Sequence, residues 1–81
     1  MEESHYLLEL VHECCAPPED LPVTLDRPLR ELRMDSMKMI QIVFELETRF
    51  EIELEEHRLF QVEQLGDLLY LVLEARLQKT A

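Results

Sequence analysis

The stretch that decides the fold is DSMKMIQIVFELETRF, residues 35–50. Over residues 36–50 the apolar side chains recur three and four positions apart, which predicts an amphipathic helix. Asp35 or Ser36 supplies its cap, because side-chain oxygens accept hydrogen bonds from the first free N–H groups of a helix. The side of this helix that faces the core is formed by Met39, Ile42, Val43, Leu46 and Phe50.

A second group of apolar residues lies beside this core face. Met37, Ile40 and Phe44 widen the apolar arc beyond what a small bundle needs to bury. We expect these residues to form an exposed recognition patch next to Ser36. The alternative is that the long preceding loop or a short third helix covers them.

Three further helices are expected around this one, at residues 4–15, 56–60 and 63–78. Ser4 is the expected cap of the first helix, which ends before the prolines of residues 16–18. The loop over residues 16–35 is long, and a turn of helix at residues 29–32 is compatible with it. Residues 51–54 are read as an extended link. The prediction is an all-α four-helix bundle with three longer helices, one short helix and a long first loop.

Length, charge and cysteine content limit the classes of partner and ligand that fit this chain. The chain has 81 residues, which corresponds to a single small domain, 1–81, and its net charge is −10. So acidic a surface repels nucleic acid and suits partners with basic patches; the alternative is that the charge only keeps a small protein soluble. The longest apolar run is too short for membrane insertion. Cys14 and Cys15 are adjacent, so we expect free thiols in a reducing cytoplasm. With His12 they supply too few ligands for a metal. A monomer is the default expectation.

Ser36 is the candidate attachment point. At a helix N-terminus, unpaired N–H groups and the helix dipole favour an attached phosphate. The alternative is that Asp35 and Ser36 form only a cap. No histidine lies close to Ser36 in sequence to activate it, and no glycine-rich phosphate loop is present, so we expect a protein that is not an enzyme.

Several segments resemble the acyl carrier protein family. They are LRELRMDSM at residues 29–37, ELE at 45–47, FEIEL at 50–54, QLGDL at 64–68 and the upstream LDRPL at 25–29. The resemblance implies the carrier bundle, with 4′-phosphopantetheine esterified to Ser36, Asp35 as cap and motif residue, and acyl or aminoacyl cargo held as a thioester. It also implies a phosphopantetheinyl transferase (holo-acyl-carrier-protein synthase) and acyl or aminoacyl ligases, synthases and transferases as partners.

The resemblance also assigns surfaces. The partner-facing positions that match are Met37, Lys38, Ile40, Gln41, Phe44, Glu45 and Glu47. The positions that match an acyl pocket between helices are Leu46, Leu54, Leu59, Val62 and Leu68. The pocket positions are equally expected as plain core residues, and several are bulky, so we expect little cavity space. A carrier-like interaction module that uses no prosthetic arm is the alternative function.

Three departures from the family pattern matter. Arg33 stands where carriers usually have glycine, so we expect the loop to take a different path, since arginine resists positive φ. Met37 replaces a leucine at similar volume. Residues 27–38 hold four bases against two acids, although the whole chain is acidic. We therefore expect a specialised carrier of a dedicated pathway, such as polyketide or other secondary metabolism, rather than the housekeeping carrier of fatty acid biosynthesis. The alternative is that Arg33 and Lys38 are solvated and merely tolerated.

Overall fold

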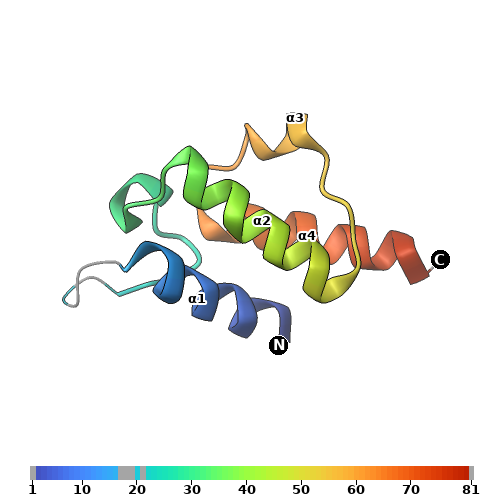
Figure 1. Cartoon of the computed structure of the whole chain (residues 1–81), viewed down its shortest axis with the longest axis horizontal. Helices are drawn as coiled ribbons and strands as arrows, with labels where there is room; N and C mark the ends of the chain where they lie inside the picture. Colours follow the sequence, from blue (N-terminus) through green and yellow to red (C-terminus); the bar gives the residue numbers. More distant parts are fainter. Residues whose placement is uncertain (1, 17–19, 21, 81) are drawn as a thin grey trace.

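The computed structural model describes residues 2–16, 20 and 22–80 and confirms the all-α fold. The elements in chain order are α1 (Glu2–Cys15), the 3₁₀ helix η1 (Leu29–Leu32), α2 (Ser36–Phe50), α3 (Glu56–Leu59) and α4 (Leu65–Thr80). In Figure 1, α2 lies across the front of the molecule with α4 behind it, α1 below it and α3 above it. The long first connection runs from α1 to the start of α2.

The core is formed where α1, α2, α4 and η1 meet. Its fully buried side chains are Leu7, Val11, Leu32, Ile42, Leu46, Leu65, Leu68 and Val72. Complete burial of one such side chain stabilises a fold by about 1.5–3 kcal/mol. This packing matters because isolated helices of this length are marginal in water.

The long first connection is fixed to the start of α4. Leu29 and Leu32 are buried in the core, and the Leu29 N–H donates to the Glu63 carbonyl at 2.9 Å. The Gly66 N–H donates to the Leu25 carbonyl at 2.7 Å. A Cβ at Gly66 would lie 3.2 Å from that oxygen, so the close approach favours glycine. Leu21 and prolines 17 and 18 lie outside the described residues.

Several helix ends differ from the sequence expectation. α1 begins at Glu2, so Ser4 lies in its first turn rather than at its cap. α4 begins at Leu65, because the Asp67 carboxylate accepts hydrogen bonds from the N–H groups of Glu63 (3.0 Å) and Gln64 (3.2 Å) and keeps both outside the helix. α3 ends at Leu59, one residue early, and α4 continues to Thr80.

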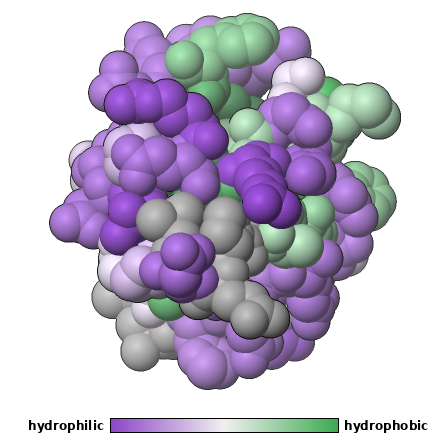
Figure 2. Space-filling model, turned by 90° about the vertical axis from the view of Figure 1, so that its left-hand side faces the viewer, coloured by the Kyte–Doolittle hydropathy of each residue, from purple (hydrophilic) through white to green (hydrophobic). Residues whose placement is uncertain are grey.

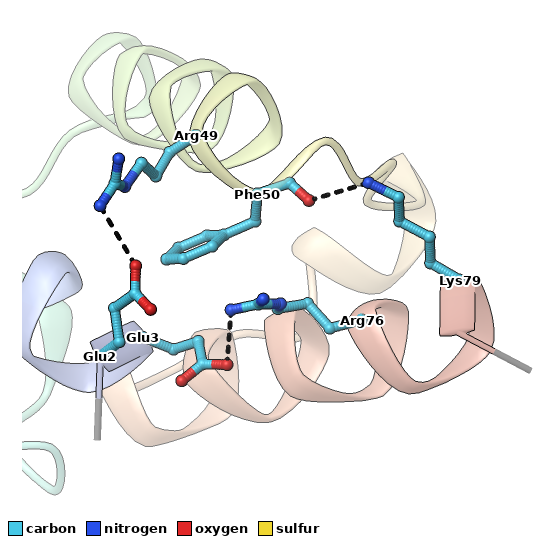
Figure 3. A network of polar contacts seen from close by, with 6 residues as sticks. All are labelled: Glu2, Glu3, Arg49, Phe50, Arg76 and Lys79. Carbon is cyan, nitrogen blue, oxygen red and sulfur yellow. Dashed lines mark hydrogen bonds and ion pairs between the residues drawn. The ribbon is translucent and has the colours of Figure 1, made fainter.

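A set of polar contacts, which we call the terminal network, joins the start of α1 to the ends of α2 and α4 (Figure 3). Arg49 pairs with Glu2 at 3.1 Å, and Arg76 pairs with Glu3 at 2.8 Å. The Arg76 guanidinium also lies 4.8 Å from the centroid of the Phe50 ring. Both ends of the described chain are therefore held near the end of α2, far from Ser36.

Candidate functional site

Ser36 is the first residue of α2, and its side chain is exposed. The residue before it, Asp35, has an extended backbone, and its Oδ1 accepts from the Lys38 N–H at 2.8 Å. The Asp35 carbonyl accepts from the Met39 N–H at 2.9 Å, which starts the helical ladder. The positive end of the α2 dipole is therefore directed at the Ser36 region, where an anionic group on Oγ is favoured.

The first turn of α2 is basic rather than acidic. It contains no acidic residue after the cap, and its charged residue is Lys38. A cation at this end opposes the helix dipole. Its Nζ is held by the Arg33 carbonyl, 3.2 Å away, which ties the turn before Ser36 to the helix after it.

Arg33 adopts the left-handed conformation of the glycine usual at this position, with φ 61° and ψ 28°. The expectation of a different loop path was therefore wrong. The turn is stabilised because the Arg33 N–H donates to the Leu29 carbonyl, and Lys38 holds the Arg33 carbonyl. These bonds offset a steric cost of about 1–2 kcal/mol for a residue with a Cβ.

An apolar groove of about 540 Å³ opens beside Ser36, between α2 and α3. Its lining residues are Leu29, Met34, Asp35, Ser36, Met39, Ile40, Val43, Phe44, Glu47, Glu56, Leu59 and Phe60. Figure 2 views the molecule from the end where α2 begins, and apolar surface there lies beside strongly hydrophilic side chains. The serine and the groove thus adjoin, so an arm on Ser36 has an apolar surface next to its root.

The five positions that the resemblance suggested for an acyl pocket, which were equally expected as core residues, lie mostly against the core rather than in this groove. Of the five suggested residues, Leu59 lines it. Leu46 and Leu68 are fully buried in the core, and Leu54 and Val62 are partly buried against it. Phe60, which sequence reasoning missed, is 82% exposed on the α3 side. The available signal was that an aromatic residue ends the expected short helix.

The suggested partner-facing residues lie on two flanks of α2. Met37, Ile40 and Phe44 are exposed, 78%, 69% and 63%, on the flank toward the groove. Gln41 and Glu45 line a separate hollow against α1. Glu47 is tied to the chain, because its Oε2 accepts from the Leu54 N–H at 2.9 Å. The exposed apolar patch therefore lies on one flank.

The two thiols are free and lie at the end of α1. Cys15 is buried, with its Sγ 3.7 Å from the Met34 Sδ, whereas Cys14 is half-buried. Burial raises the pKa of both thiols, and Glu13 and Glu45 raise that of Cys14 further. Both groups are therefore protonated thiols at neutral pH.

Residues 2–16, 20 and 22–80 contain neither a cluster of metal ligands nor a helix suited to a bilayer. No three His, Cys, Asp or Glu side chains come close enough there to hold a metal ion together. In the same part of the chain, no helix combines the length and apolar character needed to cross a bilayer.

The family described as "phosphopantetheine attachment site" matches residues 5–72, most of the chain. The chain belongs to this family. The matched range contains Ser36 and all the residues that line the groove. The description names the prosthetic group, 4′-phosphopantetheine, which family members carry covalently.

Two curated relatives of this family member are described as acyl carrier protein homologues. The one from Mycoplasma genitalium is 41% identical over 46 residues, 57% of this chain and 55% of the relative. The one from Mycoplasma pneumoniae is 38% identical over 45 residues, which are 56% of this chain and 54% of the relative. The matches thus span about half the length of these relatives.

The crystal structure of an acyl carrier protein from Thermotoga maritima has a similar fold. It superposes with a TM-score of 0.79, covering 100% of this chain and 96% of that one, at 21% identity. At this identity the likeness establishes the shared carrier bundle.

Proposed function

We propose that this chain is a carrier protein that bears 4′-phosphopantetheine on the Oγ of Ser36. The observation that carries the proposal is the exposed Ser36 at the first position of α2, beside the groove, in a chain of the phosphopantetheine attachment family. The α2 dipole stabilises the phosphodiester charge, and Asp35 keeps the helix start in place. The terminal thiol of the arm holds the cargo as a thioester.

Attachment requires a separate transferase and coenzyme A. The Ser36 Oγ attacks the phosphorus that bears the pantetheine, and the bond between the two phosphates of coenzyme A breaks. The adenosine 3′,5′-bisphosphate leaves with the bonding electrons, and a base of the transferase takes the serine proton. The chain contributes an accessible hydroxyl at a preformed helix end, and we propose that it is not itself an enzyme.

The partners fit the exposed flank of α2. Met37, Ile40 and Phe44 offer an apolar contact next to the arm, and Lys38 gives its edge a positive charge. Ligases, synthases and transferases that handle acyl or aminoacyl thioesters are the classes of enzyme that would dock there. We place this activity in the cytoplasm, with the carrier as a monomer, since two free thiols and a net charge of −10 suit both.

Intact-mass spectrometry tests the proposal. The protein is incubated with coenzyme A, magnesium and a promiscuous phosphopantetheinyl transferase. We expect a gain of one phosphopantetheine that is absent in Ser36→Ala and retained in Ser4→Ala, which alters the other serine of the chain. No gain under conditions that modify a control carrier contradicts the proposal and favours an interaction module without an arm.

A further inference from the structure

The short helix α3 forms one wall of the groove, and of its own side chains Leu59 packs partly against the core. It has four residues, and none of them is buried. Glu56, Leu59 and the adjoining Phe60 nevertheless line the groove opposite α2. Because hydrophobic burial is the main force that holds helices in place and α3 buries only part of one apolar side chain, polar contacts add to what holds this wall.

The strongest polar contact of α3 is an ion pair with α4. The two terminal guanidinium nitrogens of Arg58 donate hydrogen bonds to the two carboxylate oxygens of Glu74. Nη1 donates to Oε1, and Nη2 donates to Oε2 at 3.2 Å. Both side chains are about two-thirds buried, with exposed fractions of 32% and 27%. This paired geometry is more directional than a single contact between two long side chains.

Neighbouring groups also influence the two charges of the pair. Together with Arg58, the Tyr70 side chain favours the ionised form of the Glu74 carboxylate and lowers its pKa. The hydrogen bond with Arg58 lowers the pKa of Glu74, and the same bond raises the pKa of Arg58. Glu53 and Glu55 line the same small hollow as Arg58 and Glu74, and Glu55 also pairs with His57 at 3.5 Å. Three glutamates therefore lie around Arg58, and its guanidinium forms its two hydrogen bonds with Glu74.

We propose that Arg58 and Glu74 are positioning residues that hold α3 on α4 and thereby fix the groove wall beside Ser36. The ion pair touches neither the serine nor the groove lining, so it acts through the placement of Leu59 and Phe60. The use of that wall to accept the apolar part of a cargo rests on the proposed function. The hold on α3 does not, and it is measurable in the unmodified chain.

Amide hydrogen exchange by NMR on the unmodified protein provides the test. Three amides report on α3 and its end through their backbone bonds: Leu59 to the Glu55 carbonyl, Gln61 to that of Arg58, and Val62 to that of Leu59. In Glu74→Gln we expect these amides to exchange about two- to fivefold faster, the range expected when one partly exposed ion pair near the protein surface is lost. The amides of Ile42 and Leu46, in the centre of α2, should keep their rates.

The matched control is Glu3→Gln, which removes a pair of similar exposure between α1 and α4. Phe60 and Phe50 supply independent readouts, since Phe60 lines the groove and Phe50 lies in the terminal network. We expect Glu74→Gln to shift the ring resonances of Phe60, and Glu3→Gln to shift those of Phe50. Equal effects of the two variants on α3 and Phe60 overturn the proposal.

A double-mutant cycle separates the ion pair from other effects of each side chain. Arg58→Gln and the double variant complete the cycle with Glu74→Gln. If the pair holds α3, the double variant accelerates exchange about as much as one single variant does. Acceleration equal to the product of the two single effects shows independent roles and contradicts the proposal. Because the chain carries no arm here, neither result depends on whether Ser36 is modified in the mass experiment.

Discussion

The ammonium group of Lys38 donates a hydrogen bond to the backbone carbonyl of Arg33, 3.2 Å away. This bond crosses Asp35 and Ser36, and it joins the left-handed turn before α2 to the first turn of the helix. Since the acceptor is a backbone atom, the bond is independent of the side chain at position 33. Arg33 can therefore be replaced without removing the acceptor of the Lys38 hydrogen bond.

Arg33→Gly should stabilise the fold. Glycine adopts φ 61° without a Cβ clash, although it also increases the freedom of the unfolded chain. We expect a net gain of about 0.5–1 kcal/mol, or roughly 2–8 °C in Tm. Arg33→Ala removes the same charge and keeps the Cβ, so its Tm in a thermal melt should stay near that of the parent. A Tm that rises equally in both variants assigns the effect to charge instead.

Asp35→Ala should weaken the start of α2. The variant loses the acceptor of the Lys38 N–H, which lies 2.8 Å from Oδ1, and a lost cap costs about 1 kcal/mol. Asp35→Asn keeps an acceptor oxygen, so urea unfolding should give it nearly the parental stability. If both variants lose stability equally, the charge of Asp35 matters more than its hydrogen bond.

The two thiols should react in a fixed order. Iodoacetamide consumes thiolate, and the raised pKa values of Cys14 and Cys15 keep the thiolate fraction low at pH 7. Cys14 should be alkylated first and more slowly than free cysteine, with a rate that rises as the pH approaches its raised pKa. Cys15 is buried and should react mainly after denaturation. Peptide mass spectrometry reads the order, and faster labelling of Cys15 in the native protein contradicts it.

Arg76→Ala should be the most damaging change in the terminal network. It removes the contact with the Phe50 ring and leaves Glu3, whose side chain is 16% exposed, without its ion pair. We expect a loss of about 1–2 kcal/mol in urea unfolding. Arg49→Ala is the control, because it also removes a guanidinium–ring contact, 5.5 Å from the Tyr6 centroid, but its pair with Glu2 is largely exposed. Its loss should therefore be smaller, below about 1 kcal/mol. Comparable losses in both variants count against this ranking.

The basic first turn of α2 should affect partner choice. If the chain is a specialised carrier, a housekeeping transferase that recognises an acidic helix should use it poorly, because the first turn of α2 carries Lys38 and no acidic residue. Lys38→Glu should then raise kcat/KM several-fold, since charges at an interface rim act mainly on the association rate. Lys79→Glu adds the same charge at the far end of α4 and should have little effect. Efficient use of the parent protein contradicts the specialised role.

The start of α2 was predictable because its determinants are local. An Asp-Ser pair before a three- and four-residue apolar repeat specifies both the cap and the buried face, and α2 indeed begins at Ser36 with Asp35 as its cap. The conformation of Arg33 was not predictable from propensity alone. Two hydrogen bonds offset its steric cost: the Arg33 N–H donates to the Leu29 carbonyl, and the Lys38 ammonium group, from beyond the serine, donates to the Arg33 carbonyl.

The groove and its lining residues were harder to predict from the sequence. Periodicity on α2 identifies which residues face inward, but it does not say how far α3 stands from them. Leu46 and Leu68 were expected either as pocket or as core residues and are buried in the core, while Phe60 was assigned to no site and lines the groove. The spacing is determined by contacts between distant segments, Arg58 with Glu74 among them, 16 residues apart. Such contacts depend on the tertiary arrangement and have no local signature.

The terminal network has a practical consequence for work with this chain. It holds the first residues of α1 and the last turn of α4 close to the last turn of α2, which lies one 15-residue helix, roughly 22 Å, from the serine. An affinity tag, a fluorescent label or a solid support joined at either end would thus stand clear of Ser36. The molecule can therefore be attached to a surface at either terminus while the exposed Ser36 hydroxyl remains accessible for the modification proposed above.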